Sequence, residues 1–213
     1  MKLQVAFDCN CNTQIICDCV DRISGYIDFI EVGTPLIIEK GLLTIQELRP
    51  RYPHLKILAD LKIMDGGFYE ANAAFEAGAD IVTALAAAED ATLKGAIDAA
   101  AKHGGEIMVD MIAYPDLPRR IGELGAMGAD YICLHTAKDT QASGKDFSTF
   151  MREMKGFVKY AKLALAGGIN PANIESYTSM DPDVIIIGEG ITGASDPAEA
   201  ARIVREKMDA HQA

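Results

Sequence analysis

Short aliphatic segments alternate with longer amphipathic segments about eight times along this 213-residue chain. Strands that are apolar on both faces predict a parallel sheet covered by helices. Eight such units favour a single (β/α)8 barrel domain over residues 1–213, and an open doubly wound sheet is the alternative. The expected strands are LQVAFD, FIEVG, KILADLKI, DIVTALAA, EIMVDMI, YICLHT, KLALAGG and VIIIGEG, and three clear helices are FYEANAAFEAG, DATLKGAIDAAAKHG and PAEAARIVREKMDA.

The balance of acidic and basic residues limits the kinds of molecule that the protein is expected to bind. Acidic residues outnumber basic ones by 31 to 20, for a formal net charge of -11. This balance argues against binding to nucleic acid or to an anionic membrane surface, although it allows one locally basic pocket for a small anion. No segment approaches the roughly 20 apolar residues that a membrane helix needs, and the first residues are typical of a strand rather than a signal peptide. A cytoplasmic protein is expected.

Five cysteines without a regular disulfide framework indicate free thiols, which fits the same compartment. Four of them lie close together, at Cys9, Cys11, Cys17 and Cys19. A zinc or redox site is one interpretation. The spacing differs from the C-x2-C pattern of zinc sites, so a helix with Cys17 on its buried face is the preferred interpretation.

Polar side chains mark the carboxyl ends of five expected strands. In a parallel barrel these ends converge on one mouth, where the active sites of this fold are built. One charged strand end can be a helix cap, but five converging ends favour a functional site. The five residues are Asp8, Glu31, Asp60, Asp110 and His135.

The third expected strand carries the pattern D-x-K-x-x-D, formed by Asp60, Lys62 and Asp65. Alternation along a strand places Asp60 and Lys62 on the same face, with Asp65 just beyond the strand. Carboxylates on either side of Lys62 would keep it charged, so that it could stabilise an oxyanion. A purely structural buried ion pair is the alternative.

Three of the five residues at these strand ends suggest specific chemistry. Glu31 and Asp60 end adjacent strands, and two carboxylates suit Mg²⁺, with substrate oxygens and waters as the other ligands. His135 is the natural proton carrier near neutral pH, although a histidine buried for structural reasons is the alternative.

The last two expected strands both run into glycine-bearing loops, LALAGGIN and IIIGEGIT. Glycine lets backbone N–H groups approach an anion, and the loops after strands seven and eight commonly bind phosphate in barrels. The expected phosphate-binding residues are Gly167, Gly168, Gly188 and Gly190. Glu189 would repel a phosphate there unless its side chain points away.

Residues 135–145, HTAKDTQASGK, follow the sixth expected strand. Their small side chains and Gly144 are typical of a lid over a ligand, which would include Lys138 and Gln141. A plain surface loop is the alternative.

With these motifs in place, the chain resembles the orotidine monophosphate decarboxylase suprafamily over nearly its whole length. The segments that carry the resemblance are EVGTP, LADLKIMD, VDMIA, HTAKDTQASGK, AGGI and IGEGITG. The resemblance implies a homodimeric barrel in which Glu31 and Asp60 bind Mg²⁺, and the metal chelates a sugar phosphate. It also implies that Asp65 reaches the neighbouring subunit's site.

The resemblance further implies an aldehyde-lyase, which condenses ribulose 5-phosphate with formaldehyde through an enediolate. Lys62 would stabilise the enediolate and His135 would be the base. Asp8 would line the polar site, and Asp110 would help to position protons. Gly168 and Gly188 match phosphate-loop positions.

Two other activities remain possible at this point. One is decarboxylation of 3-keto-L-gulonate 6-phosphate, in a branch that carries Glu, Arg and Thr where this chain has Asp110, Lys138 and Ala166. Those three differences favour the aldol reaction. The other is a non-catalytic barrel that binds sugar phosphates, which would have little use for Lys62 between two carboxylates.

Overall fold

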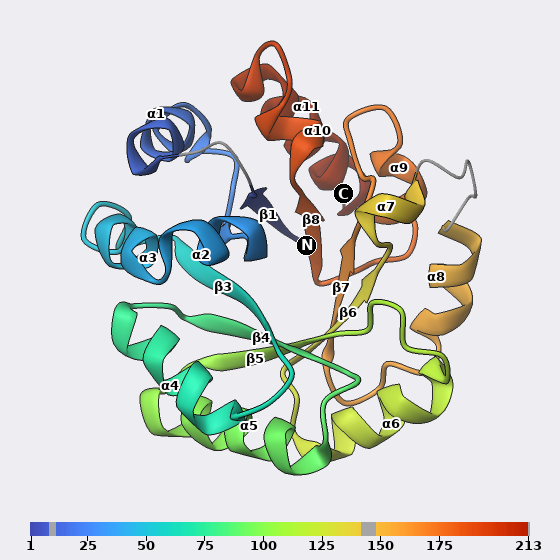
Figure 1. The fold of residues 1–213 in the computed structure, drawn as a ribbon. Helices are drawn as coiled ribbons and strands as arrows, with labels where there is room; N and C mark the ends of the chain where they lie inside the picture. The colour runs from blue at the N-terminus through green and yellow to red at the C-terminus, as the bar shows by residue number, and fades with distance from the viewer. Residues whose placement is uncertain (9–11, 142–147, 213) are drawn as a thin grey trace.

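Eight parallel strands close into a barrel at the centre of the computed structural model, which describes residues 1–8, 12–141 and 148–212 (Figure 1). The strands follow one another around the barrel in chain order, and β8 pairs with β1. This confirms the predicted parallel (β/α)8 architecture. The strands are β1 (Lys2–Phe7), β2 (Phe29–Val32), β3 (Lys56–Ile63), β4 (Ile81–Leu85), β5 (Glu106–Asp110), β6 (Tyr131–His135), β7 (Lys162–Ala166) and β8 (Val184–Ile187).

Helices surround the barrel and connect successive strands (Figure 1). Those in the described ranges are α1 (Thr13–Ile23), α2 (Thr34–Lys40), α3 (Leu43–Leu48), α4 (Gly67–Ala77), α5 (Asp90–His103), α6 (Leu117–Met127), α7 (Lys138–Gln141), α8 (Ser148–Lys155), α9 (Ile174–Thr178), α10 (Glu189–Thr192) and α11 (Pro197–Gln212). None of them is both long enough and apolar enough to cross a membrane.

Local sequence explains where the long helices stop. Helices α4, α5 and α6 each end at a glycine in the left-handed conformation, at Gly78, Gly104 and Gly128. Glycine adopts this conformation without a steric penalty, so it closes the last turn and directs the chain into the next strand. The three helices predicted from the sequence therefore match α4, α5 and α11 to within a few residues.

Two hydrophobic clusters form the core. The larger lies between the barrel and its helices, and the smaller fills the barrel interior. At the amino-terminal end the interior holds large side chains such as Phe29, Ile81 and Tyr131. Toward the carboxyl ends of the strands, the interior side chains include small ones such as Ala6 and Ala166. These two residues also line the pocket described below. The change in side-chain size leaves room for a ligand at the carboxyl end.

Candidate active site

A cavity of about 690 Å³ opens at the carboxyl ends of the strands. Most of the side chains and glycines singled out in the sequence line it. They are Asp8, Glu31, Asp60, Lys62, Asp110, His135, Lys138, Gly167, Gly168, Gly188 and Gly190. Of the other three residues, Asp65 lies outside this lining, Gln141 ends α7, and Gly144 lies outside the described residues.

Lys62 lies between two carboxylates in this pocket. Its Nζ is 2.6 Å from Asp60 Oδ2 and 3.3 Å from Asp110 Oδ2. Burial alone would lower the pKa of Lys62, but the charges of Asp60 and Asp110 outweigh it and raise that pKa above its ordinary value. Lys62 is therefore a fixed cation across the physiological pH range.

The second carboxylate beside Lys62 differs from the one expected. Among the described residues, the ion pairs of Lys62 are with Asp60 and Asp110, and Asp65 is not one of them. Asp65 is exposed and its Oδ1 accepts the N–H of Gly66. The expectation that Asp65 flanks Lys62 within one chain is therefore wrong, because the chain turns outward after β3 toward α4.

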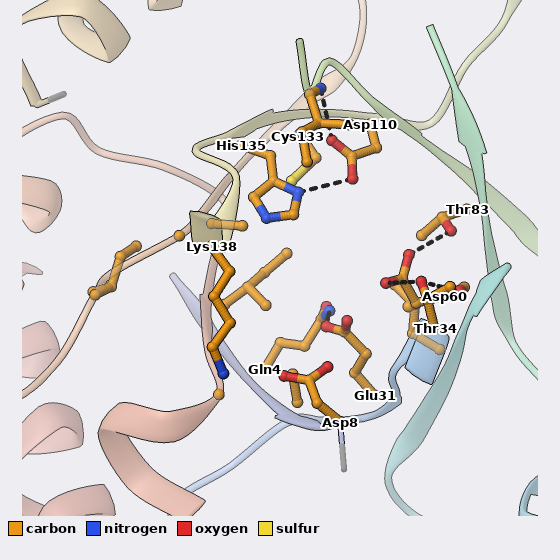
Figure 2. Close-up of a pocket in the computed structure, with 18 of the residues that line it drawn as sticks. Gln4, Asp8, Glu31, Thr34, Asp60, Thr83, Asp110, Cys133, His135 and Lys138 are labelled. Atoms are coloured by element: carbon orange, nitrogen blue, oxygen red, sulfur yellow. Dashed lines mark hydrogen bonds and ion pairs between the residues drawn. The ribbon is translucent and has the colours of Figure 1, made fainter. Parts of the chain in front are cut away.

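Asp110 also orients His135. His135 Nδ1 lies 2.8 Å from Asp110 Oδ2, and Figure 2 shows the imidazole facing the cavity. Burial would raise the pKa of Asp110, but the hydrogen bond and charge of His135, with Lys62, hold that pKa below its usual range. Since an ionised carboxylate only accepts, Nδ1 must carry the proton. Nε2 is then left as a proton acceptor for a ligand in the pocket.

Asp60 is held by two hydroxyl groups that the sequence reasoning did not single out. Thr83 Oγ1 donates to Asp60 Oδ1 at 2.7 Å, and Thr34 Oγ1 lies 2.7 Å from Asp60 Oδ2 (Figure 2). Threonine in a strand or at a helix start is common for purely structural reasons, so neither residue stood out. The one feature that could have indicated Thr83 is its place on β4, the strand next to the one that carries Asp60.

Glu31 lies buried at the base of the pocket, where its Oε2 accepts a hydrogen bond from Gln4 Nε2. Burial, and secondly the negative charge of Asp60, raise the pKa of Glu31 to about 8. Gln4 is fully buried and lines the pocket floor (Figure 2). Alternation along β1 could have placed Gln4 on the same face as Asp8, but a buried amide carried no functional signal.

The pair Glu31 and Asp60 fits a hard divalent cation. The two carboxylates offer oxygen ligands, and a bound cation would offset the effect of Asp60 on the ionisation of Glu31. Within residues 1–8, 12–141 and 148–212, no group of three or more His, Cys, Asp or Glu side chains could hold a metal ion. An ion such as Mg²⁺, which takes oxygen ligands and completes its shell with water and substrate, would suit this pair.

The glycine loops after β7 and β8 bring backbone close to the cavity. Gly167 has φ of 102°, and a Cβ there would lie 2.3 Å from the carbonyl oxygen of Thr136. A Cβ on Gly190 would lie 2.6 Å from the carbonyl oxygen of Ile169. Both positions require glycine. The contact at Gly190 packs the loop after β8 against the loop after β7, whereas the contact at Gly167 packs the loop after β7 against the segment after β6.

Glu189 points across the mouth rather than into the loops. Its Oε2 lies 3.3 Å from Lys138 Nζ, and both side chains are exposed, at 79% and 73%. The lysine therefore offsets the carboxylate that seemed out of place in the sequence. A role of α7 as a lid stays a prediction.

The cysteine cluster is divided by the fold. Cys17 is buried in α1, and Cys19 on the same helix is partly buried. Cys9 and Cys11 lie outside the described residues. Cys133 lies in the pocket wall, where burial first and then the charge of Asp110 raise the pKa of its thiol. That thiol is therefore a neutral lining group.

A cation, a histidine and several carboxylates at the carboxyl mouth of a closed parallel barrel define a (β/α)8-barrel enzyme. Residues 1–204 match the model of the orotidine 5'-phosphate decarboxylase / HUMPS family. The chain belongs to this family. The resemblance seen in the sequence is thus confirmed.

Relatives within the family are similar over their full lengths. The chain is 44% identical over 211 residues to 3-hexulose-6-phosphate synthase 2 of Staphylococcus saprophyticus, covering 99% of both proteins. Its structure matches that of 3-hexulose-6-phosphate synthase from Salmonella typhimurium with a TM-score of 0.95 and 39% identity, over 99% of this chain and 100% of the other. These relatives confirm the prediction of an aldehyde-lyase.

The alternative branch is also represented. The structure of 3-keto-L-gulonate-6-phosphate decarboxylase from Vibrio cholerae matches with a TM-score of 0.85 and 28% identity, over 99% of this chain and 98% of the other. The chain is more similar to the two synthases than to this decarboxylase.

Proposed function

We propose that the chain catalyses the Mg²⁺-dependent aldol condensation of ribulose 5-phosphate with formaldehyde to give 3-hexulose 6-phosphate, and the reverse cleavage. The observation that carries this proposal is the position of Asp110, which contacts both Lys62 and His135. One carboxylate thereby sets a cation and a proton acceptor around the same space. An enediolate-forming reaction needs both groups at adjacent atoms of one substrate.

In the proposed reaction, Nε2 of His135 removes a proton from C1 of ribulose 5-phosphate. The electron pair left at C1 delocalises onto the C2 oxygen, and the ammonium of Lys62 stabilises the enediolate that results. C1 then attacks the carbon of formaldehyde, which forms the new carbon–carbon bond. The oxygen of the former aldehyde takes up a proton, and the C2 carbonyl is restored.

Glu31 and Asp60 would hold Mg²⁺ beside Lys62. When bound, the ion supplies Lewis-acid stabilisation of negative charge on substrate oxygens. Gly167, Gly168 and the loop after β8 would receive the phosphate through backbone N–H groups.

We also propose that the enzyme is a cytoplasmic homodimer in which Asp65 completes the partner's site. Large apolar side chains are exposed on α2 and α4, the helices that follow β2 and β3, and Asp65 lies between β3 and α4. Ile38 on α2 and Tyr69 on α4 are each 81% exposed, and Met64 precedes Asp65 directly. Exposed apolar groups beside a charged residue that lacks a role in its own pocket favour a subunit interface there.

The test is turnover with Mg²⁺ on two substrate sets: ribulose 5-phosphate plus formaldehyde, and 3-keto-L-gulonate 6-phosphate. Hexulose phosphate formation that is lost with a chelator supports the proposal. Dominant release of CO₂ would instead assign the decarboxylase activity and mean that Asp110, Lys138 and Ala166 do not decide the reaction. Phosphate-ligand binding without either turnover would assign a binding protein.

A further inference from the structure

The D-x-K segment interrupts the regular pairing of its strand. In the ladder between β3 and β4, Ala59 pairs with Val82, and the next pair is Ile63 with Ala84. Residues 60–62 of β3 therefore face a single residue of β4, Thr83. This is a bulge, which bends a strand and redirects side chains, and bulges occur often beside active sites.

The bulge places Lys62 in an uncommon backbone conformation. Its φ is 48°, in the left-handed region that residues with a side chain rarely adopt. Such a conformation persists only where neighbouring groups hold it. The residue held in this way is the cation of the site, so its backbone determines where the ammonium lies.

The group that holds the bulge is the hydroxyl of Thr83. The N–H of Lys62 donates to Thr83 Oγ1 at 2.9 Å, which replaces the carbonyl that a regular ladder would supply. The same hydroxyl donates its proton to Asp60 Oδ1 at 2.7 Å. Its two roles are compatible, because a hydroxyl has one donor and two acceptor sites.

Burial strengthens the two hydrogen bonds of the Thr83 hydroxyl. Thr83 lines the pocket but is only 4% exposed, so its hydroxyl has little access to water. Asp60 Oδ2 in turn lies 2.6 Å from Lys62 Nζ. One hydroxyl thus ties the backbone of Lys62 to the carboxylate that pairs with its ammonium.

We propose that Thr83 is a positioning residue that fixes Lys62 and Asp60 relative to each other for the reaction. This rests on the proposed function, in which Lys62 stabilises the enediolate. Thr83 itself acts through its two neighbours. Removal of the Thr83 hydroxyl should lower the rate of the chemical step more than it weakens binding of the sugar phosphate, because the proposed phosphate loops follow β7 and β8, away from Thr83 on β4.

The test compares Thr83→Val, which removes the hydroxyl at nearly constant shape, with Thr83→Ser, which keeps it. Thr178→Val is the matched control, since Thr178 is a buried threonine of α9 whose hydroxyl bonds to Glu175 O outside the pocket. For Thr83→Val we expect kcat to fall roughly 10- to 100-fold with little change in KM for ribulose 5-phosphate. Thr83→Ser and Thr178→Val should stay within about threefold of the parent.

Hydrogen exchange of the Lys62 amide, followed by NMR, gives a readout that needs no turnover. The amide should be protected in the parent and in Thr83→Ser, and in Thr83→Val it should exchange faster than the other strand amides of the same variant, measured well below its unfolding temperature. Thr83→Ala serves as the hydroxyl-free variant if the valine variant does not fold. An unchanged kcat or an equally protected Lys62 amide without the hydroxyl would overturn the proposal. If the parent shows no aldol turnover, the proposed function fails, whereas the amide exchange still decides whether Thr83 holds the bulge.

Discussion

Asp110 Oδ2 lies 2.8 Å from His135 Nδ1 and 3.3 Å from Lys62 Nζ, so one carboxylate oxygen contacts both the proton carrier and the cation. The oxygen fixes the tautomer of His135 and balances the charge of Lys62. The imidazole and the ammonium are thus positioned in part by the same oxygen. The two groups therefore form a single unit, although they lie on different strands.

Replacing Asp110 by Asn tests this unit. The amide oxygen can still accept from Nδ1, but the negative charge that stabilises a protonated imidazole is lost. We expect proton transfer from C1 of ribulose 5-phosphate to slow by about 10²- to 10⁴-fold. The measurement is exchange of the C1 proton with D2O in the absence of formaldehyde, followed by NMR.

A matched control is Asp116→Asn, because Asp116 is exposed and pairs only with Arg119 on α6 in the described structure. It should leave the exchange rate unchanged. His135→Gln should abolish the exchange altogether. Parent-like exchange in Asp110→Asn would mean that His135 does not depend on the carboxylate.

The raised pKa of Glu31 gives a prediction for stability against pH. The folded protein keeps a proton on Glu31 up to about pH 8, whereas the unfolded chain releases it at the ordinary value for a glutamic acid. The free energy of unfolding should therefore fall as pH rises through this window, by up to about 1.4 kcal/mol per pH unit. Glu31→Gln removes this pH dependence. Without Mg²⁺, the unfolding free energy of Glu31→Gln minus that of the parent should therefore increase as pH rises from 5 to about 8.

Chemical denaturation at several pH values, with and without Mg²⁺, measures the effect. At about pH 8 the ion should stabilise the parent by mass action and leave Glu31→Gln nearly unchanged. If the difference in unfolding free energy between Glu31→Gln and the parent is the same at every pH, Glu31 is not buried in its uncharged form. Equal stabilisation of both proteins by Mg²⁺ would show that the ion binds elsewhere.

Much of the fold could be predicted because its signal is local. Runs of Val, Ile and Leu on both faces of a strand have few alternatives to a buried parallel sheet, and glycine ends several of the helices. Polar residues at the ends of such runs then had to meet at one mouth. The sequence alone therefore located the pocket and most of its charged groups.

Contacts between strands could not be predicted in the same way. The pairing of Lys62 with Asp110 depends on the tilt of β3 and β5 and on a bulge that leaves no distinct sequence pattern. The sequence placed Asp65 beside Lys62 because it is near in the chain, but the turn into α4 carries it outward. Thr83 could not be identified from the sequence because threonine is common in strands. Its hydroxyl bonds to the Lys62 N–H only because β3 has a bulge at that position.

Glu189 offers a test of the phosphate side of the pocket. Its carboxylate lies 3.3 Å from Lys138 Nζ at the mouth, next to the loops proposed to bind phosphate. Glu189→Gln should remove a negative charge that repels a phosphate bound at these loops. We expect KM for ribulose 5-phosphate to fall roughly two- to fivefold at low ionic strength, with less change at high salt because both groups are exposed.

Steady-state kinetics at two ionic strengths measures this effect, with Glu199→Gln on α11 as an exposed control that pairs with Arg202. The control should leave KM unchanged. A rise in KM for Glu189→Gln would instead mean that the carboxylate orients Lys138 usefully toward the substrate.

The proposed role of Asp65 in the partner's site can be tested by mixing two inactive variants. Lys62→Ala and Asp65→Ala should each lose nearly all activity as homodimers. In a mixed dimer, one site combines the intact Lys62 of one chain with the intact Asp65 of the other, and the second site lacks both. Subunit exchange should therefore restore up to about half of the parental activity per mixed dimer, which is measured after the two proteins are unfolded and refolded together. If Asp65 acts within its own chain, every site in the mixture lacks one group and activity stays absent.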